Sequence, residues 1–190
     1  MADQTPPDLT TAARELIALR RNRAAARRNG RDLIEAMDRE AERRLGALFT
    51  ENDPVSGRPV ALLVVSDDRL GDDYEKATPR PLPDSASRLV VEILGRVLKV
   101  EIDDFGYVTV SGDVEKPTEL RSAVLIGEDV VFYREAAGFD RVVRGVQDRP
   151  TEEGVPFASL LAQLVDSIAR SERERAGITA DDDTRITATA

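Results

Sequence analysis

The residues that most often carry chemistry are scarce in this chain of 190 residues. It contains no cysteine and no histidine, which excludes a thiol nucleophile, a zinc–thiolate site, a serine–histidine pair and a histidine-ligated metal. What remains is carboxylate chemistry, or a serine activated by one of three lysines: Lys76, Lys99 and Lys116. Because no spacing pairs these groups into a site, we expect a protein that is not an enzyme and that uses no cofactor.

Acidic residues gather in one segment that could attract a hard cation. The acidic, proline-bearing residues 67–83 contain two aspartate pairs and a glutamate: Asp67-Asp68, Asp72-Asp73 and Glu75. Their spacing does not fit a calcium loop, because Arg69 and Leu70 occupy positions that should supply oxygen ligands. We predict a long solvated loop without a metal, and its length is typical of functional or mobile loops.

The strongest chemical signal is a run of basic residues near the N-terminus. Over residues 14–31, seven arginines accompany one glutamate, although the whole chain has a formal net charge of −9. A guanidinium group can bind a phosphate or a carboxylate through two hydrogen bonds. We favour protein carboxylates, in which the rest of the chain is rich, and keep nucleic acid as the alternative. The arginines expected to contact a partner are Arg20, Arg21, Arg23, Arg27, Arg28 and Arg31.

Part of this run, from Asn22 to Arg28, resembles the basic region of leucine-zipper transcription factors. Such a region must continue without a break into leucines that repeat every seven residues. Here Asn29-Gly30 follows at once, a pair apt to leave the helical region, and the apolar residues do not keep a clean heptad register. We therefore reject this family.

Two amphipathic helices are predicted within residues 8–53. A flexible lead over residues 1–7 ends in two prolines, and Asp8 can cap the helix that follows. We expect Asn29-Gly30 to break or kink the chain, so that the helices form a hairpin or a kinked rod. The second helix carries an apolar stripe at steps of three and four residues: Leu33, Ile34, Met37, Ala41, Leu45 and Leu48.

A small antiparallel sheet is predicted over residues 58–149. We expect a tight turn at Gly95-Arg96 and another at residues 103–106, whose letters Asp104-Phe105-Gly106 match a kinase signature that no other kinase motif accompanies. The expected strands, arranged as one meander, are residues 59–66, 88–94, 97–102, 107–111, 122–126 and 130–133. Residues 141–146 form either a further edge strand or a helical turn.

One more amphipathic helix is predicted over residues 156–177, where Gly177 ends it. The acidic residues 178–190 have too little apolar surface to fold alone and are expected to be a flexible tail. The chain as a whole is thus predicted to have an α+β fold with helices at both ends.

The three helices carry more apolar surface than a small sheet can obviously cover, so self-association or docking is expected. The predicted function is that of a non-catalytic assembly or adaptor protein in a multi-subunit complex, such as a phage virion or another particle. The helix faces expected to contact the partner carry Leu33, Met37, Leu45, Leu48, Leu160, Leu164 and Ile168.

The rival hypothesis is a regulatory protein that binds nucleic-acid phosphates through the arginine-rich helix, and salt dependence would distinguish the two. No run of residues is long and apolar enough to span a membrane. We therefore expect protein partners, no membrane partner, and a location in the cytoplasm or in a particle assembled there.

Overall fold

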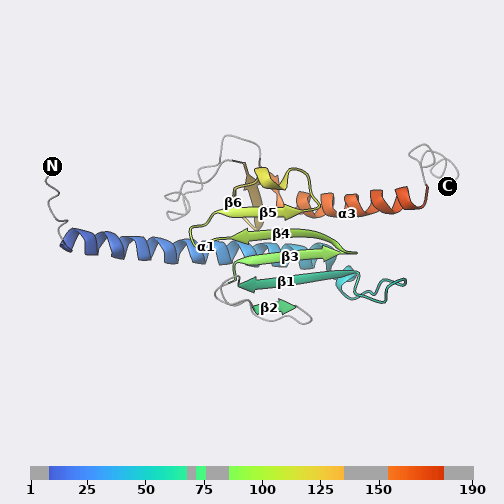
Figure 1. Cartoon of the computed structure of the whole chain (residues 1–190), viewed down its shortest axis with the longest axis horizontal. Coiled ribbons are helices and arrows are strands. Elements are labelled where there is room, and N and C mark those ends of the chain that lie inside the picture. Colours follow the sequence, from blue (N-terminus) through green and yellow to red (C-terminus); the bar gives the residue numbers. More distant parts are fainter. Residues whose placement is uncertain (1–8, 68–71, 76–85, 135–153, 178–190) are drawn as a thin grey trace, which may run out of the picture.

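The α+β fold predicted from the sequence is confirmed. In the computed structural model, a long N-terminal helix and a C-terminal helix pack against an antiparallel sheet (Figure 1). The structure describes residues 9–67, 72–75, 86–134 and 154–177. The expected lead, the expected tail and the edge strand expected at residues 141–146 lie outside the described residues.

The first helix, α1 (Leu9–Phe49), runs for 41 residues without a break. The interruption predicted at Asn29-Gly30 is therefore wrong, and the N-terminal region is one rod (Figure 1). Gly30 is buried, and a Cβ added to it would lie 3.1 Å from Cγ2 of Ile102 in the sheet. The glycine thus permits close approach between helix and sheet rather than ending the helix.

The main sheet has five antiparallel strands in the order β2-β1-β3-β4-β5. They are β1 (Ala61–Asp67), β2 (Asp72–Glu75), β3 (Arg88–Ile93), β4 (Arg96–Ile102) and β5 (Val108–Gly112). Strand β2 lies inside residues 67–83, which were predicted to be a loop throughout, and it pairs with β1. An edge strand needs no apolar pattern, since backbone groups make its ladder, and its acidic composition therefore hid it.

The β3–β4 hairpin is confirmed, but its turn lies one residue earlier than predicted. Ile93 pairs with Arg96, so the two loop residues are Leu94 and Gly95. Their φ angles are 47° and 80°, and two positive φ angles are the signature of a type I′ turn. The apolar pattern does not distinguish the observed register from the one predicted with the loop at Gly95-Arg96. In both registers, inward-facing residues of β3 lie opposite inward-facing residues of β4.

The strands after β5 form a second sheet, so the single predicted meander is also wrong. A short helix, η1 (Pro117–Glu119), follows β5, and the second sheet has the order β6-β7-β8. Its strands are β6 (Ser122–Ile126), β7 (Asp129–Tyr133) and β8 (Val155–Pro156). The chain leaves the main sheet at Gly112, where φ is +118° and an added Cβ would collide with the carbonyl oxygen of Val97. Only glycine fits there.

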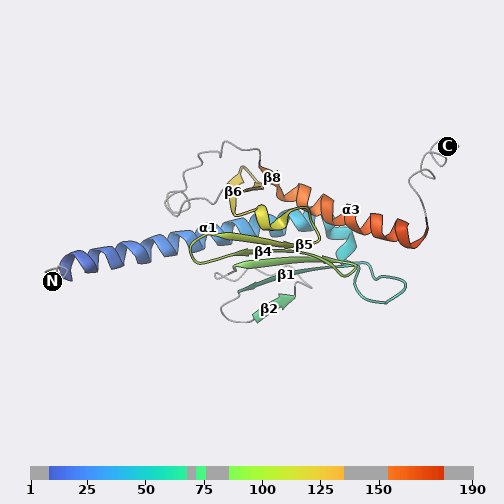
Figure 2. The ribbon, with the colours of Figure 1, turned by 45° about the horizontal axis from the view of Figure 1, so that its top comes forward.

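The C-terminal helix, α3 (Phe157–Arg175), is confirmed, and Gly177 follows it with a φ of +69°. Helices α1 and α3 contact each other and lie on the same face of the main sheet (Figure 2). Helix α1 contacts β1 and β3, α3 contacts β4, and β7 of the second sheet contacts both helices.

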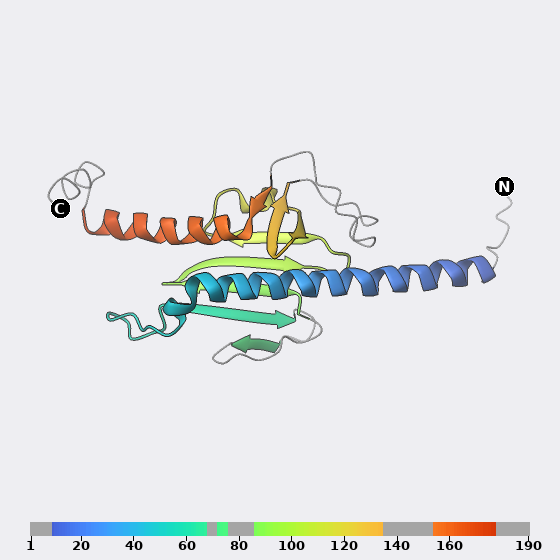
Figure 3. The same ribbon diagram turned by 180° about the vertical axis from the view of Figure 1, so that it is seen from behind.

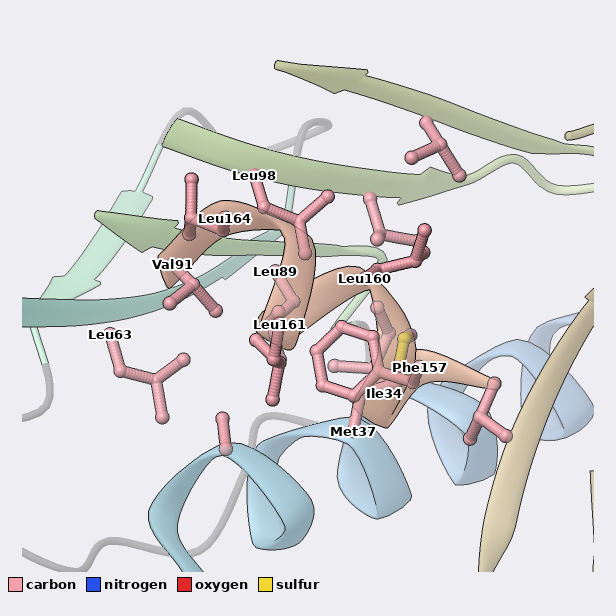
Figure 4. Packing of buried hydrophobic residues seen from close by; sticks show 14 of the residues in the cluster. Ile34, Met37, Leu63, Leu89, Val91, Leu98, Phe157, Leu160, Leu161 and Leu164 are labelled. Atoms are coloured by element: carbon pink, nitrogen blue, oxygen red, sulfur yellow. The ribbon is translucent and has the colours of Figure 1, made fainter. Parts of the chain in front are cut away.

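The hydrophobic core lies between these two helices and the main sheet (Figure 4). Alternate residues of the strands point into it, as the period of a pleated strand requires. Fully buried side chains from all three layers meet there: Leu89, Val91 and Leu98 from the sheet, Ile34 and Met37 from α1, and Phe157, Leu160, Leu161 and Leu164 from α3. The central part of α1 is thus one wall of the core.

Candidate functional site

The first turns of α1 extend beyond the body of the protein. Residues 10–21 are all exposed, and the first buried residue along the described part of the helix is Ala26. Figures 1 and 3 show this stretch reaching past the ends of the strands. We call residues 10–22 the arm, which is about 20 Å long at a rise of about 1.5 Å per residue. Residues 26–49 are called the anchored part.

One stripe of α1, apolar except at Arg23, runs from the arm into the core. The stripe advances at steps of three and four residues, which place its members on one side of a helix: Leu16, Leu19, Arg23, Ala26, Gly30, Leu33 and Met37. From Ala26 onward the body of the protein covers it. In the arm it is uncovered, because the side chains of Leu16 and Leu19 are 56% and 58% exposed. We call Leu16, Leu19 and Arg23 the seam.

A turn of the main sheet meets α1 at the base of the arm. Asp104, between β4 and β5, accepts hydrogen bonds from Nε and Nη2 of Arg27, each at 2.9 Å, and forms an ion pair with Arg23. The guanidinium carbon of Arg23 also lies 5.8 Å from the centroid of the Phe105 ring, within cation–π range. The carboxylate of Asp103 accepts hydrogen bonds from the backbone N–H groups of Phe105 and Tyr107 and thereby shapes the turn. Asp104 therefore ties the arm's base to the sheet.

An open hollow of about 420 Å³ lies beside this turn, and Glu101, Asp103 and Asp104 line part of it. These carboxylates are already engaged. Glu101 pairs with Lys99 at 2.6 Å, Asp103 binds the turn backbone, and Asp104 binds the two arginines. The hollow is thus a consequence of how the turn meets the helix, and its chemistry indicates no particular ligand.

The six arginines predicted to bind a partner have different surroundings. Arg23 and Arg27 meet a carboxylate of the same chain, which is the type of contact favoured from the sequence. Arg31 is half-buried in the anchored part. The remaining three are exposed and make no ion pair with any residue that the structure describes: Arg20, Arg21 and Arg28.

The apolar residues predicted to contact a partner belong to the core of this chain. Five are buried and two are partly buried against them: Met37, Leu45, Leu160, Leu164 and Ile168 in the first group, and Leu33 and Leu48 in the second. The body of the same chain covers them, which corrects the expectation that they form a docking surface. Sequence reasoning did not single out Leu16 and Leu19, the exposed members of the stripe, because their spacing is the same as that of its buried members.

The unbroken helix also bears on the resemblance to leucine-zipper proteins. It removes the objection that Asn29-Gly30 interrupts the helix. A stronger objection replaces it: the stripe that would form the zipper, beyond Arg23, is packed against the body from Ala26 onward. The family is therefore still rejected.

Two carboxyl groups of the body accept hydrogen bonds that lower their pKa values. The backbone N–H of Val97 and the guanidinium of Arg96 lower the pKa of Asp113. Burial raises the pKa of Glu40, but hydrogen bonds from Arg44 and Arg43 outweigh it, so that this pKa is lowered overall. A carboxyl group used as a general acid would instead need a raised pKa. No cluster of three or more metal-ligating side chains occurs among the described residues.

No protein-family model matches this chain, and no curated protein and no solved structure shows significant similarity to it. Within the described ranges, no helix is both long enough and apolar enough to cross a membrane.

Proposed function

We propose that this protein is a non-catalytic assembly or adaptor protein that docks onto a protein partner through the arm, within a multi-subunit complex or particle. The observation that supports the proposal is the exposure of Leu16 and Leu19, one turn apart on a helix that extends past the body. Scattered single apolar residues are ordinary on a surface, whereas adjacent ones that share a protruding face are typical of contact sites.

The arm suits docking because it is already helical. An isolated helix of this length is marginal in water, since its first turn fixes several residues for one hydrogen bond. Here the anchored part provides that nucleus, and the arm extends it. A partner that binds the arm therefore bears little ordering cost. Full burial of a leucine side chain contributes about 1.5–3 kcal/mol, so the seam can supply a useful part of a binding free energy.

The test compares two double variants of the full chain. Leu16→Asp with Leu19→Asp places two charges on the seam. Thr10→Asp with Ala18→Asp places the same charges on sides of the arm turned away from the seam, at exposed positions. Partners are captured with the tagged proteins from the cells that produce this chain and are quantified by mass spectrometry, while sedimentation velocity measures self-association. We expect the seam variant alone to lose a partner or to lose self-association.

Both variants should unfold thermally like the unchanged protein, because all four positions lie outside the core. The proposal is contradicted if the unchanged protein is a strict monomer and captures the same proteins, in the same amounts, as the seam variant.

A second candidate function is a nucleic-acid-associated regulatory role for the same helix. Arg14, Arg21 and Arg28 recur at steps of seven, which place them together on the side of α1 away from the seam. All three are exposed and make no ion pair with a described residue. Such a row of guanidinium groups can contact phosphates.

Mobility-shift assays with DNA and RNA at increasing salt test this second role. If the protein binds phosphates through this row, the logarithm of the affinity falls steeply with the logarithm of the salt concentration. Arg21→Gln removes one phosphate contact and should reduce the magnitude of that slope by about one. The absence of any retention at low salt eliminates this role and leaves protein docking.

A further inference from the structure

We infer that the partner of the arm is an acidic amphipathic helix of another protein, whose apolar face covers Leu16 and Leu19 and whose carboxylates meet the arginines at the base of the arm. This inference rests on the proposed docking role and adds the chemistry of the partner. Three observations carry it: the charge at the end of the seam, the width of the seam, and the position of the body.

The charge at the base of the arm is positive. Arg20, Arg23 and Arg27 follow one another at steps of three and four and so lie on the side of the helix that carries the seam. Arg23 and Arg27 share the carboxylate of Asp104, yet their side chains remain 49% and 42% exposed. Arg20 makes no ion pair with a described residue. Two guanidinium groups thus share one carboxylate beside the exposed leucines, with Arg20 one turn before Arg23, and a partner carboxylate at Arg20 and Arg23 would complement this charge.

The width of the seam favours a helix as its occupant. Leu16 and Leu19, three residues apart, form a narrow stripe at a spacing by which helices pack in coiled coils, whereas Ile17, which is 50% exposed, lies on another side of the helix. Beyond Arg23 the body covers the same side of α1, since Ala26, Gly30 and Met37 are buried. A partner helix that packs on the seam must therefore end near Arg20 and Arg23. Carboxylates at that end of the partner helix would face these two arginines.

A second copy of the chain fits this site less well. In a parallel pair, each body would occupy the side of α1 that the other helix needs beyond Arg23. In an antiparallel pair, the second arm brings the same arginines and only one acidic residue, Glu15. The arm of a second copy thus supplies at most one carboxylate, together with the same arginines, to the base of the arm.

The experiment uses two synthetic helical peptides as probes. Both have three heptads with leucine at positions a and d, and they differ only in carrying glutamate or lysine at positions e and g. Each labelled peptide is titrated with the full chain, and fluorescence anisotropy reports binding. We expect the glutamate peptide to bind about tenfold or more tightly than the lysine peptide, with a preference that shrinks as salt rises.

Two single variants locate the charge effect. Arg20→Glu should weaken binding of the glutamate peptide severalfold. Arg21→Glu makes the same change in charge one residue along, on the side away from the seam, and should leave the affinity nearly unchanged. Equal losses in the two variants would mean that only net charge matters, and they would overturn the assignment of the base as the contact.

The remaining outcomes separate this inference from the proposed function. If both peptides bind equally and the Leu16→Asp, Leu19→Asp variant binds neither, the inference of an acidic partner is overturned while docking through the arm stands. If neither peptide binds and the chain self-associates through the seam, the partner is a second copy, and the inference is overturned while docking stands. If neither peptide binds and the chain is a strict monomer without a seam-dependent partner, both proposals fall.

Discussion

The arm and the anchored part of α1 have the same kind of sequence and opposite surroundings. Met37 in the anchored part is fully buried, whereas Leu19, on the same stripe, is 58% exposed. The cause is a mismatch in length. Helix α1 has 41 residues and is about 60 Å long, while the longest described strands of the main sheet have 7 residues and span about 23 Å.

This difference separates what stabilises the fold from what is available to a partner. The anchored part is committed to the core, so changes there should act on the free energy of unfolding. The arm contributes little to that core, so changes there should act on association.

Hydrogen exchange should show the largest contrast. Amides of the arm can open by fraying from the helix end, whereas those around Met37 require opening of the core. We expect protection factors about a thousandfold or more higher in the anchored part. Mass spectrometry of peptides from α1 measures this directly. Equal protection in a monomeric sample would show that something covers the arm.

Truncation of one side chain in each part should show the next largest contrast. Met37→Ala leaves a cavity in the core and should lower the free energy of unfolding by about 2–5 kcal/mol. Leu19→Ala removes an exposed side chain and should change that free energy by less than about 0.5 kcal/mol. Urea unfolding of the two variants gives both values. A similar loss in both would mean that the arm packs against the chain itself.

The contrast between the arm and the anchored part also shows which features of this chain can be predicted from its sequence. Periodicity correctly predicts that Leu45 and Leu164 lie on the apolar faces of helices. It says nothing about which molecule covers them, since a leucine buried by its own sheet and one buried by a partner have the same spacing. The residues predicted to dock therefore lie on the buried faces, and the exposed Leu16 and Leu19 were not singled out.

The other differences have local physical causes. Gly30 has a high propensity to end a helix, but its contact with Ile102 gives it a role that only the tertiary structure reveals. Strand β2 was hidden by its acidic composition, because pairing at a sheet edge depends on the backbone. The contact of Asp104 with Arg23 joins residues 81 positions apart, and no local pattern connects such residues.

Two glycines of the anchored part sharpen the comparison at smaller scale. A Cβ added at Gly46 meets nothing within 4 Å, so Gly46→Ala should stabilise the protein by about 0.5–1 kcal/mol through helix propensity. Gly30→Ala gains the same propensity but must displace Ile102, and we expect no gain, or a loss of up to about 1 kcal/mol. Thermal unfolding compares the two. Equal stabilisation would show that Gly30 is not required for the close approach of helix and sheet.

The smallest expected effect concerns the boundary between the two parts. Asp104→Asn removes the charge that holds Arg23 and Arg27, whose side chains are about half exposed, so the free energy of unfolding should fall by no more than about 1 kcal/mol. The effect of Asp104→Asn on amide hydrogen exchange should be local. The point along α1 at which amides become protected should move from near Arg23 toward Gly30, because the helix is no longer tied to the turn.

The matched control for that variant is Glu35→Gln, which removes an ion pair of 2.7 Å with Arg39 within α1 itself. This pair ties the helix to its own next turn and not to the sheet, so its loss should leave the boundary of protection where it is. At high salt the unchanged protein should approach the behaviour of Asp104→Asn, because exposed ion pairs are screened. If the boundary moves in neither variant, backbone packing at Ala26 and Gly30, rather than charge, determines where the arm begins.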